Sequence, residues 1–348
     1  NMKDLAEYKN EIHSCSKCGL CQSVCPIYEV TKNDCSVSRG MFIMLKGLLK
    51  GELKMSKKLN KYLDLCLKCG ACTKFCPSGI DIVDIIASAK AEYFQSHPME
   101  KFISFIQSKL IFGLGVNTLG LFSKNIISQK FDKKVIYFGG CGGNLKGNKS
   151  VVAILNACGI EVVTPQFGCC GIPFYVRGDK NSFEKAKQKF INLLDKCETR
   201  EIVTTCASCE KTLKNYNIDG LIVKNIFEYI KEHNLNLKLK KKIRATFHKP
   251  CNIDNYSDIE WVLNNTENLE YIPMKNFDKC CGLNGIFKLS DYKILSKIPK
   301  EKHENIRQTK AKTVLTSCLG CEAALLLYSF GKYKVCDLTE FLAKNITQ

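Results

Sequence analysis

The sequence CLKCGACTKFCP, from Cys66 to Pro77, spaces four cysteines as C-x2-C-x2-C-x3-C and follows the last one with proline. This spacing is typical of a [4Fe–4S] site, in which three closely spaced thiolates bind three irons of one cubane. In proteins with two such sites, the fourth cysteine, here Cys76, binds the cluster of the other run. The stretch therefore predicts a second copy of itself.

The second copy lies upstream, where CSKCGLCQSVCP runs from Cys15 to Pro26 with identical spacing. Two runs with this spacing predict a pair of cubane clusters whose fourth ligands are exchanged. We expect one cluster at Cys15, Cys18, Cys21 and Cys76, and the other at Cys66, Cys69, Cys72 and Cys25.

The composition favours a globular protein of two or three domains, with 348 residues, 45% of them hydrophobic, and 22 cysteines. A disulfide-linked secreted protein is the alternative. It is disfavoured because the cysteines follow metal-ligand spacings and because NMKDLAEYKNEIH, at the start of the sequence, has no apolar signal segment. We expect a reducing, cytoplasmic location.

The formal net charge of +18 leaves nucleic acid, an anionic membrane surface or an acidic partner as targets. Nucleic acid is disfavoured, because the lysines are scattered and no RNP, helix-turn-helix or zinc-finger signature is present. The densest basic run, Lys238 to Lys242, is predicted to be a solvated linker between two halves of the chain. We therefore expect a protein partner, with peripheral contact at the inner face of the membrane as a further expectation.

Residues 1–98 are predicted to form an all-α head that carries both cubane runs. Apolar side chains recur at helical intervals in two stretches of this region. The first stretch contains Met41, Met44, Leu45, Leu48 and Leu49, and the second contains Ile82, Ile85, Ile86, Ala89 and Tyr93.

Residues 99–131 are predicted to be an apolar helical linker. Between Phe102 and Phe122 the only charged residue is Lys109. Three glycines and several polar side chains make a transmembrane helix a poor interpretation of this stretch. A buried pair of linker helices is favoured, and a helix lying on a membrane interface is the functional alternative.

From residue 132 onward the chain repeats itself. Cysteines in matching sequence contexts are displaced by 110 residues (Cys141 and Cys251), 111 (Cys169 and Cys280) and 112 (Cys206 and Cys318). Predicted strands alternate with predicted helices in both halves, which indicates two α/β units with small, mostly parallel sheets over residues 132–236 and 243–348. The whole chain is thus predicted to be α+β.

Each repeat carries one leading cysteine, a Cys-Cys-Gly triplet and a C-x2-C pair, placed where predicted strands end. The ten residues are Cys141, Cys169, Cys170, Cys206, Cys209, Cys251, Cys280, Cys281, Cys318 and Cys321. Five thiols exceed the four that tetrahedral zinc takes, so we favour an iron–sulfur cluster in each repeat and keep zinc as the alternative. The adjacent pair is a poor disulfide because its geometry is strained.

Four other cysteines, Cys35, Cys158, Cys197 and Cys336, fall outside these motifs. Cys158 and Cys197 lie at predicted helix ends, and buried thiols are the favoured interpretation. Cys35 could approach a cluster, but no ligand role is assigned to it. His248, three residues before Cys251, could donate a proton, although a hydrogen-bonded turn residue is the favoured interpretation.

The two cubane runs, the segment SVSRGMFIMLKGLLKGEL and the two CCG repeats together resemble the iron–sulfur subunit of glycolate oxidase. That family is similar to the C subunit of anaerobic glycerol-3-phosphate dehydrogenase and to the D subunit of heterodisulfide reductase. The resemblance implies noncubane [4Fe–4S] clusters in the five-cysteine units. The sequence departs from the family pattern at Gly139-Gly140, where Pro-Gly is usual, and at Lys249, where an aspartate is usual.

The resemblance implies an electron-transfer subunit of a respiratory dehydrogenase. A separate FAD-containing subunit would oxidise a substrate such as glycolate, lactate or glycerol 3-phosphate, and electrons would pass through this chain to a quinone or another acceptor. We expect no flavin on this chain, because it has no G-x-G-x-x-G after a strand and no Walker A motif. The alternatives are a disulfide or heterodisulfide reductase acting at the CCG clusters and, least favoured, a zinc-stabilised scaffold.

Overall fold

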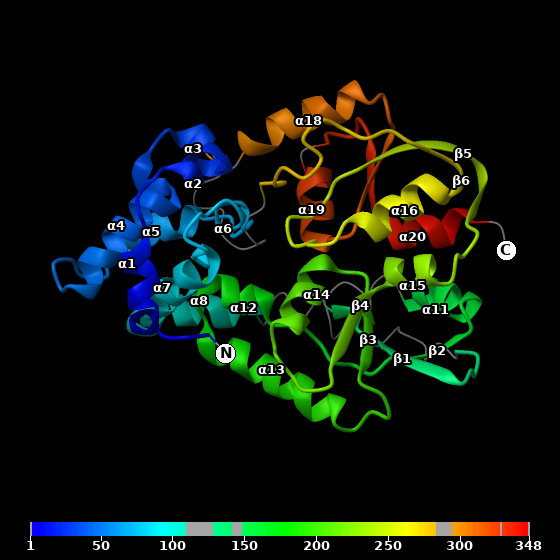
Figure 1. Ribbon diagram of the computed structural model, residues 1–348, viewed down its shortest axis with the longest axis horizontal. Coiled ribbons are helices and arrows are strands. Elements are labelled where there is room, and N and C mark those ends of the chain that lie inside the picture. Colours follow the sequence, from blue (N-terminus) through cyan, green and yellow to red (C-terminus); the bar gives the residue numbers. More distant parts are fainter. Residues whose placement is uncertain are drawn as a thin grey trace. The chain divides into compact units, whose positions relative to one another are not determined.

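The computed structural model describes residues 2–108, 128–140, 148–282, 294, 296–327 and 329–346. Their contacts divide the chain into two units (Figure 1). Unit 1 comprises Asn1–Gln107, Pro173–Glu184 and Lys279–Lys300. Unit 2 comprises Ser108–Ile172, Lys185–Asp278 and Glu301–Gln348. Each unit has its own core.

Unit 1 is helical in the part of residues 2–107 that the structure describes, as the sequence predicted. Its elements are η1 (Leu5–Tyr8), α1 (Lys9–Ser14), α2 (Leu20–Ser23), α3 (Pro26–Thr31), η2 (Asp34–Ser36), α4 (Ser38–Leu49), α5 (Lys57–Leu65), α6 (Ala71–Lys74), α7 (Ile82–Ser96) and α8 (Pro98–Ser108). Helix α12 (Ile172–Arg177) and the start of α13 (Lys180–Leu194) follow from the first repeat. The predicted apolar stripes on α4 and α7 supply much of the core, because Met41, Leu45, Ile85 and Ile86 are buried there.

Residues 173–184 and 279–300 pack onto this head through apolar and ionic contacts. Tyr175 packs against Ala87 and Ala91 of α7, and the Lys180 ammonium lies 2.7 Å from the Asp4 carboxylate. In the second segment Ile298 shares a buried cluster with Ile27 and Leu65. Each repeat therefore contributes one segment to the core of unit 1.

A buried ion pair fixes the first of these segments. Lys90 on α7 is 4% exposed, and its ammonium lies 2.8 Å from the Asp64 carboxylate of α5. The same ammonium donates a hydrogen bond of 2.8 Å to the carbonyl of Val176. Lys90 thus links α5, α7 and the end of α12.

Replacing Lys90 by methionine is expected to destabilise unit 1 by about 3–5 kcal/mol, because it breaks a buried ion pair by removing one partner. Urea denaturation followed by circular dichroism measures the change. The double variant Lys90→Met/Asp64→Asn removes both charges and should recover part of the loss. If the single variant were as stable as the unmodified chain, the ion pair would be dispensable.

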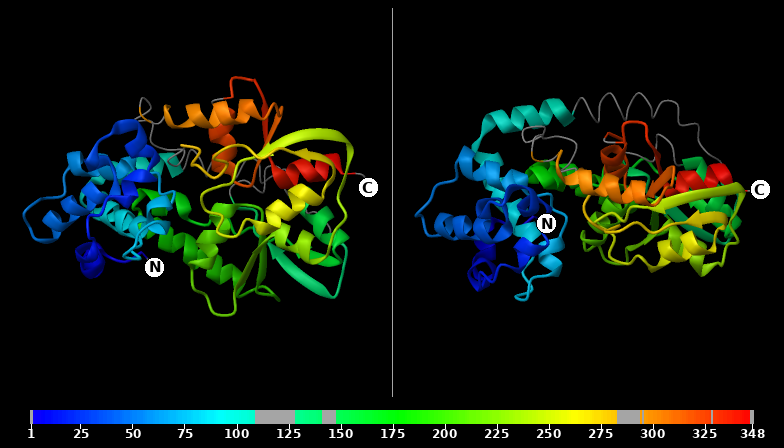
Figure 2. Two further views of the ribbon diagram at one scale, coloured as in Figure 1. Left: turned by 45° about the horizontal axis from the view of Figure 1, so that its top comes forward. Right: turned by 90° about the horizontal axis from the view of Figure 1, so that it is seen from above.

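Unit 2 holds two four-stranded parallel sheets that have the same strand order. The first sheet, β2-β1-β3-β4, is built from β1 (Lys133–Tyr137), β2 (Ile160–Val163), β3 (Glu201–Thr204) and β4 (Ile222–Asn225). The second, β6-β5-β7-β8, is built from β5 (Lys238–Phe247), β6 (Glu267–Tyr271), β7 (Thr313–Thr316) and β8 (Lys334–Asp337). The sheets can be followed in Figure 2 by their green and yellow-to-red colours. Their identical topology agrees with the predicted duplication.

The helices of unit 2 are α11 (Asn148–Ala157), α14 (Ala207–Lys214), α15 (Ile226–Glu232), α16 (Ser257–Asn265), α19 (Leu319–Leu327) and α20 (Leu338–Asn345), together with most of α13 and of α18 (Ile298–Gln308). Helices from both repeats share one buried apolar cluster that contains Leu155, Ile230, Leu263 and Leu342. The two repeats are therefore joined through a common core.

Two features of the sheets differ from the sequence prediction. The basic run Lys238–Lys242 is not a linker, because it forms the first half of β5, with the Leu239 side chain buried and the lysines exposed. In β5, the alternation of one buried leucine with solvated lysines is a strand pattern that the charge of the run obscured. The second difference is that strands β4, β6 and β8 were not predicted.

Of the predicted apolar linker, only α8 and residues 128–131 belong to the described residues, and residues 109–127 lie outside them. Among the helices that the structure describes, none combines the length and the apolar character that a membrane span needs.

Candidate metal centres

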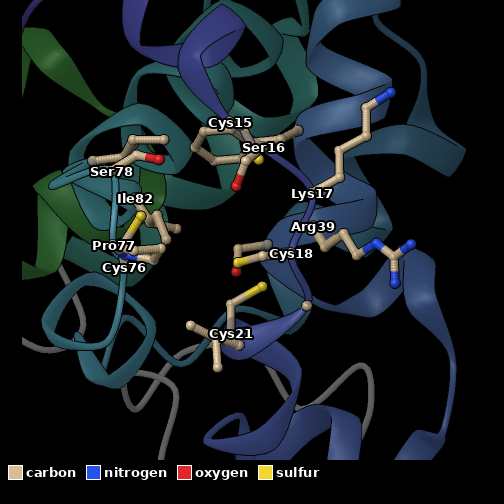
Figure 3. Close-up of a pocket in the computed structure, with 15 residues that line it drawn as sticks. Cys15, Ser16, Lys17, Cys18, Cys21, Arg39, Cys76, Pro77, Ser78 and Ile82 are labelled. Carbon is tan, nitrogen blue, oxygen red and sulfur yellow. The ribbon is translucent and has the colours of Figure 1, made fainter.

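The cysteines of the first run gather around one pocket in unit 1. This pocket, which is partly open to solvent, is lined by Cys15, Cys18 and Cys21 of the first run and by Cys76 of the second. Figure 3 shows these four side chains around a common opening, with Pro77 and Ile82 beside Cys76. The structure thus brings together the four residues that the crossed pattern selected.

Both cysteine runs fold in the same way, which explains why their thiols converge. In each run a lysine and a glycine adopt left-handed backbone conformations, with φ of 59° and 86° at Lys17 and Gly19, and 52° and 73° at Lys68 and Gly70. A short helix, α2 or α6, begins directly after the glycine. Successive N–H groups then point toward the thiols. The backbone N–H of Leu20, for example, lowers the pKa of the Cys18 thiol.

The second group forms around Cys66, Cys69 and Cys72, and it includes Cys25 from the first run. Cys25 interacts electrostatically with Cys66 and Cys69, and Cys72 interacts with all three. Burial raises the pKa of Cys25 to about 11. Burial also raises the pKa of Cys66 and Cys72, so these thiols are held neutral in the free protein.

One neighbour of the second group was not foreseen from the sequence. Within unit 1, a hydrogen bond from the Cys280 thiol lowers the pKa of Cys69 to about 7. The side chains of Cys280 and Cys281 are 6% and 5% exposed. The triplet of the second repeat therefore lies beside the cubane run of the head. No local signal predicts this, because the residues are about two hundred positions apart.

Both groups suit a [4Fe–4S] cluster by their chemistry. Each brings four thiols from two separate segments to one place, and cysteine thiolates are the ligands that such clusters take. The thiols also surround a space lined by apolar side chains, such as Phe42 and Ile80 at the first pocket. An apolar shell of this kind limits the access of solvent to a bound cluster.

In unit 2 the two repeats place their C-x2-C pairs against each other. Cys206 and Cys318 follow the ends of β3 and β7, and each precedes a helix, α14 or α19. The backbone N–H of Ala207 donates a 3.1 Å hydrogen bond to the carbonyl of Ser317. The thiols of Cys206 and Cys318 are themselves hydrogen-bonded. The duplication thus creates a contact between equivalent residues.

The contact belongs to a longer series of buried and half-buried thiols. Donation from the Cys169 and Cys209 thiols lowers the pKa of Cys170 well below its usual value. Donation from Cys206 and Cys321 has the same effect on Cys318. The series runs through Cys169, Cys170, Cys209, Cys206, Cys318 and Cys321.

Polar side chains that the sequence reasoning did not single out also connect the repeats. Ser208 lies inside the first C-x2-C pair, and its hydroxyl oxygen is 3.6 Å from the Cys318 sulfur. The same hydroxyl accepts a 2.9 Å hydrogen bond from the Asn252 side-chain amide. Asn252 directly follows Cys251, so this link ties the leading cysteine of the second repeat to the pair of the first.

The other cysteines that the sequence singled out lie outside the groups described above. Cys141 lies outside the described residues, and Cys251 is half-buried in the turn after β5. Cys35 is not among the residues that line the pocket of the first cysteine group. Cys158 and Cys197 are half-buried thiols, and Cys197 donates a hydrogen bond to the Leu193 carbonyl.

His248 is fully buried at the end of β5. Its backbone N–H donates to the Leu315 carbonyl, and a ring nitrogen lies within 4.8 Å of the Cys321 sulfur. In the part of the chain that the structure describes, neither ring nitrogen has a hydrogen-bond partner.

Comparison with known proteins finds two kinds of iron–sulfur-related domain profile in this chain. The profile of the 4Fe-4S dicluster domain matches residues 11–80. The profile of the cysteine-rich domain, CCG, matches twice, at residues 135–214 and 245–326. Together the matches cover the two cubane runs and both repeats.

Three curated relatives cover nearly the whole chain. An uncharacterized iron–sulfur protein of Methanocaldococcus jannaschii is 28% identical over 91% of this chain and 68% of its own length. A probable glycolate oxidase iron–sulfur subunit of Bacillus subtilis is 21% identical over 90% and 88%. The D subunit of the dihydromethanophenazine:CoB–CoM heterodisulfide reductase of Methanosarcina acetivorans is 24% identical over 91% and 88%.

Among solved structures, the crystal structure of a hypothetical protein from Helicobacter pylori covers 98% of this chain and 75% of its own, with a TM-score of 0.53 and 13% identity. This likeness concerns the fold alone. The chain therefore combines a 4Fe-4S dicluster domain with two cysteine-rich domains, and the similarity to the iron–sulfur subunit of glycolate oxidase and to the D subunit of heterodisulfide reductase that its motifs indicated is confirmed.

Proposed function

We propose that this chain is the iron–sulfur electron-transfer subunit of a flavin-linked oxidoreductase. The observation that carries the proposal is the crossed grouping of the two cysteine runs, in which Cys76 lines the pocket of the first run and Cys25 joins the second. The names of the relatives point to glycolate as the kind of substrate that a partner oxidises. An FAD-containing dehydrogenase subunit would deliver electrons, and a quinone or another acceptor would receive them.

The proposed ligands of the two cubanes are the eight cysteines of the head. One set is Cys15, Cys18, Cys21 and Cys76, and the other is Cys66, Cys69, Cys72 and Cys25. Bound [4Fe–4S] clusters would supply one-electron oxidation and reduction. The chain itself directs N–H groups at the thiols through its left-handed turns and excludes water with apolar side chains. The ammonium groups of Lys68 and Lys90 oppose the effect of burial on the pKa of Cys66.

For the repeats we propose up to two further clusters, noncubane in type, with zinc as the alternative. The proposed ligands are Cys141, Cys169, Cys170, Cys206 and Cys209, followed by Cys251, Cys280, Cys281, Cys318 and Cys321. We also keep the sequence boundaries 1–98, 99–131, 132–236 and 243–348, the absence of flavin on this chain, a cytoplasmic location and a peripheral membrane contact as proposals. The described part of the apolar stretch supports the last one, because Met99, Phe102 and Ile106 of α8 are exposed.

A second candidate function is the direct reduction of a disulfide at the repeats. It is favoured by the series of thiols that links both C-x2-C pairs within unit 2. A disulfide needs two electrons and two protons to become two thiols. Two adjacent redox sites could deliver the electrons together, and the protons would come from solvent.

Metal analysis of anaerobically reconstituted protein tests the cluster proposal. We expect about eight iron atoms per chain if only the cubanes form, and about sixteen if both repeats also bind a cluster. About one zinc per repeat would replace the cluster proposal there by a zinc site. Fewer than about eight irons would contradict the assignment of the head.

An assay with the chain alone separates the two functions. Reduced dye and a disulfide are supplied without any flavoprotein, and release of thiol is measured. The electron-transfer proposal expects no turnover, whereas steady thiol release would favour the reductase.

A further inference from the structure

The end of α19 and the turn that follows it expose three large apolar side chains in unit 2 (α19 is labelled in Figure 1). The exposed fractions are 55% for Leu326, 61% for Leu327 and 81% for Phe330. The turn is closed by hydrogen bonds from the Ser329 N–H and hydroxyl to the Leu326 carbonyl, at 3.1 and 2.9 Å. We call Leu326, Leu327 and Phe330 the apolar tip.

Phe330 adopts a backbone conformation that is unfavourable for a bulky side chain. Its φ of 47° lies in the left-handed region, which glycine and asparagine adopt readily and bulky residues rarely do. Because the ring is 81% exposed, packing inside the chain does not compensate for this strain. Residues in strained backbone conformations cluster at functional sites.

The first repeat provides an internal comparison. Helix α14 ends at Lys214, and three residues later Asn217 adopts a φ of 49°. Helix α19 ends at Leu327, and three residues later Phe330 adopts a φ of 47°. The same turn is therefore polar in one repeat and apolar in the other. The fold therefore does not require an apolar residue at the end of the helix or three residues after it.

Four exposed lysines lie on the chain segment that follows the apolar tip and on the turn bonded to that segment. Lys332 and Lys334 follow it in the chain, and Lys310 and Lys312 lie on the adjoining turn, since the Lys334 N–H donates a 2.8 Å hydrogen bond to the Lys312 carbonyl. All four side chains are exposed. Between Leu326 and Cys336 the sequence contains no acidic residue. The surface thus combines apolar side chains with positive charge.

We propose that the apolar tip inserts into the interfacial layer of an anionic lipid bilayer while the four lysines bind the headgroups. Leucine and phenylalanine next to lysines are typical of interfacial membrane contacts, and each lysine near such a surface is attracted to anionic lipid. A protein partner is the less favoured occupant, because leucine is under-represented among the residues that dominate protein interfaces and the tip has no arginine or tryptophan. The inference rests on the proposed peripheral membrane contact, and it is independent of the clusters.

Co-sedimentation of the full-length, cluster-loaded chain with vesicles tests the proposal. The vesicles contain phosphatidylcholine, with or without phosphatidylglycerol. We expect binding to the anionic vesicles that weakens as salt is added. The affinity of the variant Leu326→Ser/Leu327→Gln/Phe330→Asn for these vesicles should be lower by a factor of about ten or more. A second variant, with glutamine at Lys310, Lys312, Lys332 and Lys334, should lose the salt dependence.

A matched pair of single variants controls for nonspecific adhesion. Phe330→Asn installs the residue found in the first repeat, and it should weaken vesicle binding without lowering the melting temperature or the iron content. Ile222→Asn removes another exposed apolar side chain of unit 2, 52% exposed on β4, and it should have no effect on binding.

Three outcomes would overturn the proposal. Equal vesicle binding by the unmodified chain and the triple variant would place the membrane contact elsewhere. No binding to either vesicle would remove the membrane contact itself, although the electron-transfer function could stand. A dimer that the triple variant disrupts would identify the tip as an interface between two copies of the chain.

Discussion

Replacing Cys76 by serine is expected to remove one cubane of the head, and with it about four iron atoms per chain. The lost cluster should be that of the first cysteine run, although Cys76 belongs to the second, because its side chain lines the same pocket as Cys15, Cys18 and Cys21. Cys25→Ser should have the reciprocal effect, because Cys25 lies with Cys66 and Cys69. Iron analysis and electron paramagnetic resonance of the reduced protein measure both losses.

Double variants reveal which cysteines share a cluster without any spectral assignment. Cys76→Ser/Cys18→Ser should lose no more iron than Cys76→Ser alone, because both residues would serve one cluster. Cys76→Ser/Cys69→Ser should lose about eight irons, because it damages both clusters. The reverse pattern would show that each run binds its own cluster. An iron loss that follows neither pattern would instead indicate a folding defect, which circular dichroism detects.

Replacing Gly178 by alanine is expected to destabilise unit 1 by about 2–4 kcal/mol. Gly178 has a φ of 84°, and a Cβ atom there would lie 2.6 Å from the Ala91 nitrogen and from the Lys90 carbonyl carbon. These are backbone atoms of α7, so they cannot rotate away as a flexible side chain could. The segment 173–184 should therefore loosen from the head, which urea denaturation and proteolysis within this segment both report.

Gly51→Ala is the matched control for backbone strain. Gly51 also has a positive φ, of 75°, and no atom lies within 4 Å of a Cβ built there. It should therefore cost only about 1 kcal/mol, from the left-handed conformation alone. Equal losses in the two variants would mean that the close approach of Gly178 to α7 contributes nothing.

Much of this architecture could be predicted because its signals are local. The spacing of Cys66 to Cys76 and of Cys15 to Cys25 specified the helical head, and the crossed pairing followed from cluster chemistry. The near-constant displacement of Cys141, Cys169 and Cys206 onto their partners revealed the duplication. The apolar stripes of α4 and α7 identified helices whose core-facing residues are buried.

The unpredicted parts depend on charge patterns and on distant contacts. Strand β5 was interpreted as a linker because lysines outnumber the single buried Leu239 in its first half. Strands β4 and β8 are only four residues long, and each leads directly into a helix that Asn225 or Asp337 caps. The contact between Cys69 and Cys280 results from tertiary packing of a segment far along the chain.

The membership of residues 173–184 and 279–300 in unit 1 also has a consequence for biosynthesis. A ribosome releases the cysteine runs early, but the last piece of their supporting core emerges only with residue 300. Until then the head is an incomplete body, and contacts of such long sequence separation form slowly. Insertion of iron and sulfide into the head before that point would therefore meet an unfinished scaffold, and cluster assembly is better suited to a chain synthesised beyond residue 300.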